Sequence, residues 1–261
     1  MSLDEVRAYD ERLVAALVRV LWAPLVGVYV SGSVALGDYV PGSSDLDRFV
    51  VVAAPLARSL KEDVVAAARH EALPCPARGL ELVVYSAEAA ARGEGGADFE
   101  LNLNTGARMP FHVAFDPAEE PAHWFVLDRA IVRERGWALV GPPPADVFAP
   151  APRETVVEAL AESLRWHVAN AEVAGPNLVL NAVRAWRFAA TGAWVSKTEA
   201  AAWALEHGAD SGLVRSALAE REGRAGPPLD GPAAEQLVAE VLTRLAHERE
   251  RSGNDVVEER P

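Results

Sequence analysis

The feature that most constrains the fold is a pair of short motifs separated by eleven residues. Gly32-Ser33 closely follows the apolar, β-rich run Leu25–Val30, and Asp45-Leu46-Asp47 leads into the apolar run Phe49–Val52. Both runs are typical of buried strands. The glycines and proline between the motifs leave room only for a short helical turn. The sequence therefore predicts a strand, a Gly-Ser turn, a short helix and a second strand.

The two aspartates indicate a metal site. Asp45 and Asp47 are expected to project to the same side, because residues two apart in a strand share a face. Carboxylates held this close repel each other unless a cation lies between them. Oxygen ligation favours Mg²⁺, which keeps its other positions for water and substrate phosphates. An isolated Asp-x-Asp also fits two ordinary acids at a strand edge, but the surrounding strand–turn–helix–strand pattern favours the metal site.

Gly32 and Ser33 have the properties of a phosphate-binding turn. Gly32 lets the backbone approach a phosphate closely, Ser33 offers a hydroxyl group, and the helical turn presents free N–H groups. Together with Asp45 and Asp47, this turn resembles the signature of the DNA polymerase β-like nucleotidyltransferases. The resemblance implies ATP as co-substrate and two Mg²⁺ ions held by the aspartates.

That superfamily needs a third carboxylate, and Glu100 is the candidate. The segment Asp98–Asn104 alternates polar and apolar residues, which predicts a strand with one buried face. Its apolar residues are expected to face the helices, and Glu100 to share the open face with Asn102 and Asn104. From periodicity alone, Glu100 fits an ordinary solvent-facing residue of an amphipathic strand equally well.

Several segments from Leu80 to about Trp203 resemble the streptomycin/spectinomycin adenylyltransferases, a family that inactivates aminoglycosides. With the Gly-Ser turn and the aspartates, the resemblance covers nearly the whole chain before Glu250. It implies that Glu100 completes the metal-facing carboxylates and deprotonates the acceptor hydroxyl. The matching segments are Phe99–Leu101, Trp137–Pro142, Asn177–Trp186, Thr191-Gly192 and Lys197–Ala204.

The resemblance also assigns three further contacts. Arg184 matches an arginine near the triphosphate, Lys197 matches an ATP contact, and Trp124 matches a tryptophan that packs on the antibiotic. Lys197 lies at a helix start, which is unfavourable for a cation on dipole grounds, and a bound triphosphate would explain it. Without the resemblance, Arg184 and Lys197 fit surface bases, and Trp124 fits a core position on a helix.

The pattern along the chain predicts two domains joined by the proline-rich segment Gly141–Pro152. Residues 1–145 are expected to form an α/β catalytic domain, a polymerase β-like nucleotidyltransferase fold with a mixed sheet and flanking helices. Residues 153–250 are expected to form an all-α helical bundle, and the charged residues 251–261 a disordered tail. Expected strands are Leu25–Val30, the Asp strand through Val52, Leu80–Tyr85, Phe99–Asn104, Phe111–Phe115 and Ala138–Val140; expected helices are Ser2–Leu21, Leu56–Ala72, Ala122–Gly136, Glu154–Val173, Asn177–Thr191, Lys197–His207, Ser211–Glu222 and Gly231–Arg249.

Composition narrows the class of partner. Thirty-eight acids against twenty-five bases give a net charge of -13, which repels nucleic acid and attracts a cationic substrate. Plain solubility explains the same excess. The lone Cys75 cannot form an internal disulfide, the histidines lack metal-ligand spacing, and no run has membrane-span length or signal-peptide character. We expect a cytoplasmic monomer with no nucleic-acid or membrane partner.

The resulting hypothesis is a Mg²⁺-dependent enzyme that moves AMP from ATP to a hydroxyl of a small cationic acceptor. The acceptor is expected to be an aminoglycoside or aminocyclitol antibiotic, which makes the protein a resistance enzyme, and the cleft between the domains is expected to hold both substrates. Streptomycin-modifying members place a tryptophan and two aspartates between the first two helices of the second domain. Counted back without gaps from Asn177, those positions hold Arg165, Asn170 and Ala174. Losing carboxylates that would bind a cationic group favours spectinomycin over streptomycin.

Two alternatives and one anomaly accompany this hypothesis. The chain could modify a macromolecule, as a protein AMPylator or a tRNA-end enzyme does, or it could be a catalytically degenerate binding module of the same fold. The anomaly is Arg48, which occupies a position that is usually apolar after the second aspartate. It lies on the strand face opposite the expected metals.

Overall fold

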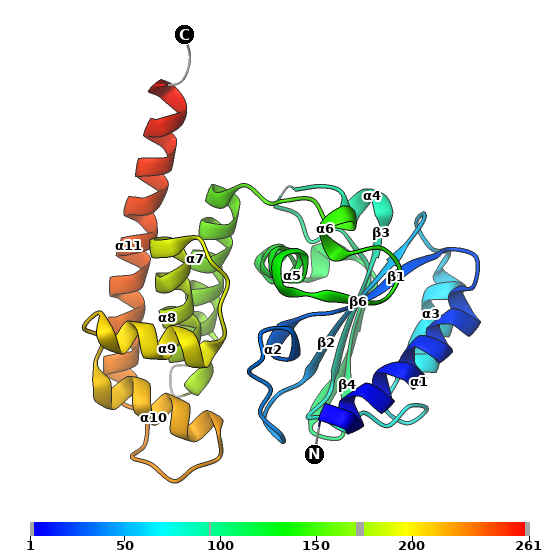
Figure 1. The fold of residues 1–261 in the computed structure, drawn as a ribbon, viewed down its shortest axis with the longest axis horizontal. Coiled ribbons are helices and arrows are strands. Elements are labelled where there is room, and N and C mark those ends of the chain that lie inside the picture. Colours follow the sequence, from blue (N-terminus) through cyan, green and yellow to red (C-terminus); the bar gives the residue numbers. More distant parts are fainter. Residues whose placement is uncertain (1–2, 94, 171–174, 259–261) are drawn as a thin grey trace. The chain divides into compact units, whose positions relative to one another are not determined.

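The computed structural model describes residues 3–93, 95–170 and 175–258. The chain divides into two compact units, Met1–Ala151 and Pro152–Pro261, drawn with their elements in Figure 1. The division falls inside the proline-rich segment. The first unit comprises α1 (Leu3–Leu21), β1 (Leu25–Val30), α2 (Gly32–Ala35), β2 (Leu46–Val52), α3 (Arg58–Ala68), β3 (Leu80–Ser86), α4 (Ala87–Ala90), β4 (Phe99–Gly106), β5 (Met109–Ala114), the 3-10 helix Pro117–Glu119, α5 (Ala122–Arg135), β6 (Trp137–Val140) and α6 (Pro144–Val147).

The described residues of the first unit form a six-stranded sheet in the order β5-β4-β3-β2-β1-β6. The β2–β3 pair is parallel, because α3 carries the chain back between them, and the other neighbouring pairs are antiparallel. The sequence prediction of a mixed sheet with flanking helices is therefore confirmed.

Each face of this sheet carries its own hydrophobic core, because alternate strand residues point to opposite sides. On one face, Leu13 and Leu17 of α1 pack with Val50 and Leu82 of the central strands, and α3 completes this layer (Figure 1). The other face is covered by α5 and is rich in aromatic rings. We call these two sides of the sheet the α1–α3 face and the α5 face.

The α5 face contains side chains from two apolar segments of the sequence, Phe49–Val52 and Leu80–Tyr85. Phe49 and Tyr85 lie on it beside Phe148, whose ring makes an edge-on contact with Tyr29 at 5.3 Å between centroids. These strands are apolar on both sides since helices bury both. Burial on both faces explains why the sequences of these strands are continuously apolar and do not alternate between apolar and polar residues.

Within the described residues, the regular elements of the second unit are all helices. Its central helix α8 packs against all four of the others and is lined by apolar residues from Leu178 to Ala189. Ser196 and Glu199 form a reciprocal capping box that starts α9, as the residue types there would predict. The elements are α7 (Arg153–Ala169), α8 (Pro176–Thr191), α9 (Lys197–Glu206), α10 (Ser211–Arg221) and α11 (Gly231–Glu258).

Some element boundaries differ from the sequence prediction. α3 ends at Ala68 rather than Ala72, because Arg69 adopts an extended conformation with ψ of 148°. α11 continues beyond Arg249 to Glu258, into the segment expected to be a tail. No helix among the described residues has the length and apolar character needed to cross a membrane.

Cys75 is buried in the α1–α3 face core, where its backbone N–H donates to His70 Nδ1 at 3.1 Å. Burial raises the pKa of the Cys75 thiol to about 11. The thiol is therefore almost entirely protonated at neutral pH and behaves as a small core residue.

Candidate active site

The first carboxylates of the site meet at the start of the two parallel strands. Asp47 of β2 is the register partner of Glu81 of β3. Neighbouring residues in register project to the same side of a sheet, here the α5 face, which Phe49 and Val83 share. Asp47 and Glu81 are thus adjacent acids in one rigid part of the fold.

Glu81 lies in an environment that opposes ionisation. Loss of solvent around its carboxyl group raises the pKa of Glu81 well above the usual value, and the negative charges of Asp45, Asp47 and Asp128 raise it further. Arg78 acts in the opposite direction but is outweighed. A cluster in which carboxylates raise one another's pKa is a typical sign of a functional site.

Asp45 lies just before β2, which begins at Leu46. Its Oδ2 accepts a hydrogen bond from Arg78 Nη1 at 2.9 Å, and 23% of its side chain is exposed. Since Asp45 contributes to the raised pKa of Glu81, the structure brings it together with the pair formed by Asp47 and Glu81. The shared role of the two aspartates as metal ligands stays a prediction.

The Gly-Ser turn packs directly on Asp47. Gly32 has a φ of +60°, and a Cβ atom there would lie 1.8 Å from Asp47 Oδ2. The Ser31 N–H donates to the Asp47 carbonyl oxygen at 3.1 Å. Only glycine gives the turn this shape and this close approach to the carboxylate.

Ser33 carries an unused polar group. Its Oγ atom is buried and has no hydrogen-bond partner within the described part of the chain. A buried hydroxyl without a partner costs free energy unless a ligand or water satisfies it. This orphaned atom lies in the turn where the sequence predicts a phosphate site.

The structure does not bring Glu100 to this cluster. Glu100 Oε2 accepts the Leu56 N–H at 3.2 Å and forms an ion pair with Lys61 Nζ at 2.7 Å. Lys61 belongs to α3, so the Glu100 side chain points to the α1–α3 face. Asp47 and Glu81 project to the opposite face. The expectation that Glu100 lies with the aspartates is therefore wrong.

A bulge in β4 explains this difference. The register between β3 and β4 shifts next to Glu100, and the simple alternation of faces is broken there. Phe99 packs on the α5 face, whereas Leu101 packs on the α1–α3 face. Asn102 and Asn104 remain on the α5 face, so the expectation that Glu100 shares a side with them is wrong.

Sequence reasoning missed Glu81, although a signal was present. Glu81 is the one charged residue in the otherwise apolar run Leu80–Tyr85. A charge in a strand that is buried on both faces needs a local reason. Parallel pairing with the Asp strand supplies that reason, but strand order is not visible in the periodicity.

The donor set fits a divalent cation in its chemistry. Asp45, Asp47 and Glu81 offer only oxygen atoms, the ligands that Mg²⁺ prefers, and a cation among them would offset the repulsion that raises the pKa of Glu81. Arg78 provides the positive charge at Asp45 in this structure. Within the described residues, no three His, Cys, Asp or Glu side chains are already arranged as a ligand set.

Comparisons with known proteins match both units. The family model "Nucleotidyltransferase domain" matches residues 13–89, and "Aminoglycoside adenylyltransferase, C-terminal domain" matches residues 146–247. Proteins from Shigella flexneri and Escherichia coli, both described as aminoglycoside (3'')(9) adenylyltransferase, are each 30% identical over 215 residues, which is 78% of this chain and 80% of theirs. The chain belongs to the aminoglycoside adenylyltransferase family. It is therefore a nucleotidyltransferase, as the sequence resemblance predicted.

A solved structure supports the same fold. A spectinomycin adenyltransferase from Enterococcus faecialis, crystallised with ATP and spectinomycin, matches with a TM-score of 0.66. The match covers 92% of this chain and 99% of that chain at 15% sequence identity. The aminoglycoside adenylyltransferase architecture is thus present across nearly the whole chain.

The remaining predicted site residues of this family member lie on α5, α8 and α9. Trp124 of α5 is partly buried and packs against the α5 face core, with its ring 4.6 Å from that of His123. Arg184 of α8 donates to Asn181 Oδ1 at 3.4 Å. Lys197, the first residue of α9, donates to Asn177 Oδ1 at 2.8 Å. These roles stay predictions from the family resemblance.

The structure also describes two of the three positions that correspond to the streptomycin contacts, Arg165 and Asn170. Arg165 on α7 forms an ion pair with Glu158 at 3.3 Å, and Asn170 Nδ2 donates to the Trp166 carbonyl at 2.8 Å. Ala174 lies outside the described residues. Neither described position carries a carboxylate.

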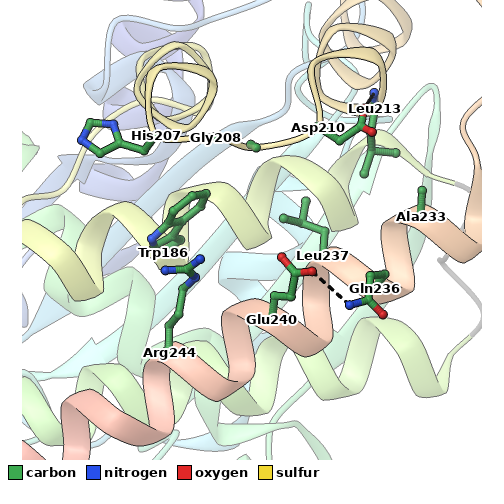
Figure 2. A pocket seen from close by; sticks show the side chains of 11 residues that line it. Trp186, His207, Gly208, Asp210, Leu213, Ala233, Gln236, Leu237, Glu240 and Arg244 are labelled. Atoms are coloured by element: carbon green, nitrogen blue, oxygen red, sulfur yellow. Dashed lines mark hydrogen bonds between the residues drawn. The ribbon is translucent and has the colours of Figure 1, made fainter.

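The helical unit also contains a hollow of about 390 Å³ beside the α9–α10 turn and α11 (Figure 2). The Arg244 guanidinium lies 4.4 Å from the centre of the Trp186 ring, and Gln236 donates to Glu240, one turn further along α11. None of the sequence-predicted site residues is among those that line it.

Proposed function

We propose that the protein transfers AMP from ATP to a hydroxyl group of an aminocyclitol antibiotic, with spectinomycin favoured over streptomycin. The observation that carries this proposal is the meeting of Asp47, Glu81 and the Gly32-Ser33 turn at the start of β2 and β3. Asp47 and Glu81 are the residue types that bind metal ions, and the turn next to them holds the buried Ser33 hydroxyl, which has no partner among the described residues. The chain also belongs to the aminoglycoside adenylyltransferase family. Such transfer would inactivate the drug, so the physiological role is antibiotic resistance in the cytoplasm, where ATP is supplied.

In this proposal Asp45 and Asp47 hold two Mg²⁺ ions, and Glu81 completes the carboxylate set. When bound, Mg²⁺ neutralises phosphate charge and thereby stabilises the developing negative charge of phosphoryl transfer. We place Glu81 in the role that the sequence resemblance gave to Glu100. The reasons are that Glu81 is the register partner of Asp47 and that Glu100 is held by Lys61 on the opposite face.

The chemistry then follows from the residues of the chain. The acceptor oxygen forms a bond to the α-phosphorus while the bond from that phosphorus to the pyrophosphate oxygen breaks. Glu81 accepts the hydroxyl proton and so acts as the general base. Ser33 Oγ donates to a phosphate oxygen, which would satisfy its hydrogen-bonding capacity.

The other contacts are proposed from the family resemblance. Arg184 and Lys197 bind the triphosphate, where their positive charges offset the charge of ATP. Each side chain donates to an asparagine oxygen, and a phosphate oxygen would accept a stronger, charge-assisted bond from the same groups. Trp124 packs on the acceptor.

The choice of acceptor rests on charge. A net charge of -13 favours a cationic ligand, and related proteins are described as aminoglycoside (3'')(9) adenylyltransferases. Asn170 and Ala174 stand at the two aspartate positions and cannot supply carboxylate contacts to a guanidinium group, and each such bond contributes about 1.5–3 kcal/mol. Streptomycin carries guanidinium groups and spectinomycin does not, so spectinomycin is the better substrate.

An assay with both antibiotics tests the proposal. Purified protein is incubated with ATP, Mg²⁺ and each drug, pyrophosphate release is followed, and mass spectrometry detects the addition of one AMP to the drug. Transfer to spectinomycin with little or none to streptomycin supports the proposal. Efficient transfer to streptomycin overturns the substrate preference. AMP found on protein or RNA instead, or no transfer with either antibiotic, overturns the function.

A further inference from the structure

Arg48 is the residue whose position the sequence left unexplained. Its side chain is fully buried on the α1–α3 face, beneath the strand that carries Asp47. The neighbouring β2 residues on this face, Leu46 and Val50, are both apolar. Arg48 therefore lies in a hydrophobic layer, at a position where its β2 neighbours on the same face are aliphatic.

Two of its nitrogen atoms bind one carboxylate. Arg48 Nε donates to Asp10 Oδ1 at 2.7 Å, and Arg48 Nη2 donates to Asp10 Oδ2 at 2.9 Å. Asp10 comes from α1 and is 6% exposed. This is the bidentate geometry that an arginine fork favours, and it joins the first helix to the central strand.

The third nitrogen reaches the catalytic strand end. Arg48 Nη1 donates to the Asp47 carbonyl oxygen at 2.9 Å. The same oxygen accepts the Ser31 N–H from the start of the Gly-Ser turn. The backbone of Asp47 is thus held by two donors, one from the turn and one from the guanidinium, while its carboxylate projects to the opposite face.

Stability alone does not account for this arrangement. Burying two charges has a high desolvation cost, and a well-packed apolar pair of similar volume is often as stable or more stable. The surrounding layer is already apolar. What an apolar pair could not do is donate a hydrogen bond to the Asp47 carbonyl.

We propose that Asp10 and Arg48 are positioning residues, which fix the direction of the Asp47 carboxylate by holding its backbone carbonyl. This inference rests on the proposed function, in which Asp47 is a ligand of the metal ions that bind the nucleotide. Neither residue touches a substrate. A small displacement of a reacting group lowers the rate strongly, by about 10²-fold for 1 Å, so the pair acts on turnover.

The test compares Arg48→Met/Asp10→Leu with the wild type. The double variant removes both charges together and leaves no buried charge unpaired. We expect an unchanged or higher Tm, a kcat about 10²-fold lower, and a KM for ATP that changes little. Hydrogen exchange should become faster at the amides of residues 31–36 and 45–49. A purely structural pair would leave kcat and these exchange rates unchanged, and that result would overturn the proposal.

Two further variants make the result specific. Arg153→Met is a matched control, since Arg153 also joins a carboxylate, Glu248, to a backbone carbonyl, that of Ala189; its kcat should stay near the wild-type value. If the double variant does not fold, Arg48→Lys is measured, because one ammonium group cannot reproduce the three bonds. Wild-type kcat in Arg48→Lys would overturn the proposal. If the wild type transfers no AMP, the proposed function fails, and the exchange rates still decide whether the pair positions Asp47.

Discussion

Asp47 and Glu81 are register partners in two parallel strands, and their side chains project from the same face of the sheet. The pairing places two acids where only a cation or a proton can relieve their repulsion. Loss of solvent and the surrounding carboxylates accordingly raise the pKa of Glu81 well above its usual value. This one relationship links the fold to the proposed chemistry, and the following predictions test its parts.

Replacing Asp47 with asparagine should abolish AMP transfer while leaving the fold intact. The amide cannot replace a charged metal ligand, and removing one of several repelling carboxylates should leave Tm unchanged or slightly higher. Pyrophosphate release and thermal unfolding measure the two effects. Asp63→Asn, at an exposed position on α3, is the control and should behave like the wild type. Normal turnover by Asp47→Asn would refute the metal assignment.

A comparison of Glu81→Gln with Glu100→Gln decides which glutamate is the proton acceptor. Loss of general-base assistance lowers turnover by about 10²- to 10⁴-fold, so Glu81→Gln should lower kcat on that scale. Glu100→Gln should keep kcat within a few-fold but lower Tm, because the partly buried Lys61 loses its 2.7 Å ion pair. The reverse ranking would return the catalytic role to Glu100.

The stability of the metal-free protein should fall as pH rises above the ordinary carboxyl pKa of 4.5. The pKa of Glu81 is higher in the folded protein than in the unfolded chain. Between the unfolded and the folded pKa, the native state therefore binds more protons than the unfolded state, and the free energy of unfolding decreases as pH rises. Thermal unfolding in a chelator should show this slope. Glu81→Gln should reduce it, and added Mg²⁺ should offset the loss. A slope that is unchanged in Glu81→Gln would contradict the assignment.

Two glycine variants separate backbone strain from contact with the site. Gly32 and Gly37 both have positive φ, +60° and +67°, so an alanine at either position costs about 1–2 kcal/mol in the left-handed region. A Cβ at Gly32 would also collide with Asp47, whereas a Cβ at Gly37 meets nothing within 4 Å. Both variants should lose stability, but only Gly32→Ala should lose most of its turnover. Equal kcat values in the two would show that the contact with Asp47 is not needed.

Much of this fold could be predicted from the sequence because its signals are local. The apolar run Leu25–Val30, the Gly-Ser turn and the Asp strand follow from residue type and spacing. The placement of Asp47 beside Gly32 follows from the same short stretch. These features depend on neighbours within about twenty residues.

The third carboxylate could not be predicted in this way, because it depends on strand order and on a bulge. Glu81 reaches Asp47 only because β3 pairs in parallel with β2. Glu100 leaves the expected face only because the β4 register shifts beside it. Arg48 is similar, since its partner Asp10 is 38 residues away in sequence. Pairings between distant segments leave little trace in the periodicity of one sequence.

The protonated, buried thiol of Cys75 gives the protein a practical property. It is the single cysteine of the chain, and its burial together with its raised pKa should slow its reaction with maleimide dyes at neutral pH. A cysteine introduced on the surface of each unit would therefore be labelled selectively, without first deleting a native thiol. Fluorescence energy transfer between two such dyes could then follow, one molecule at a time, how the separation of the units responds to nucleotide.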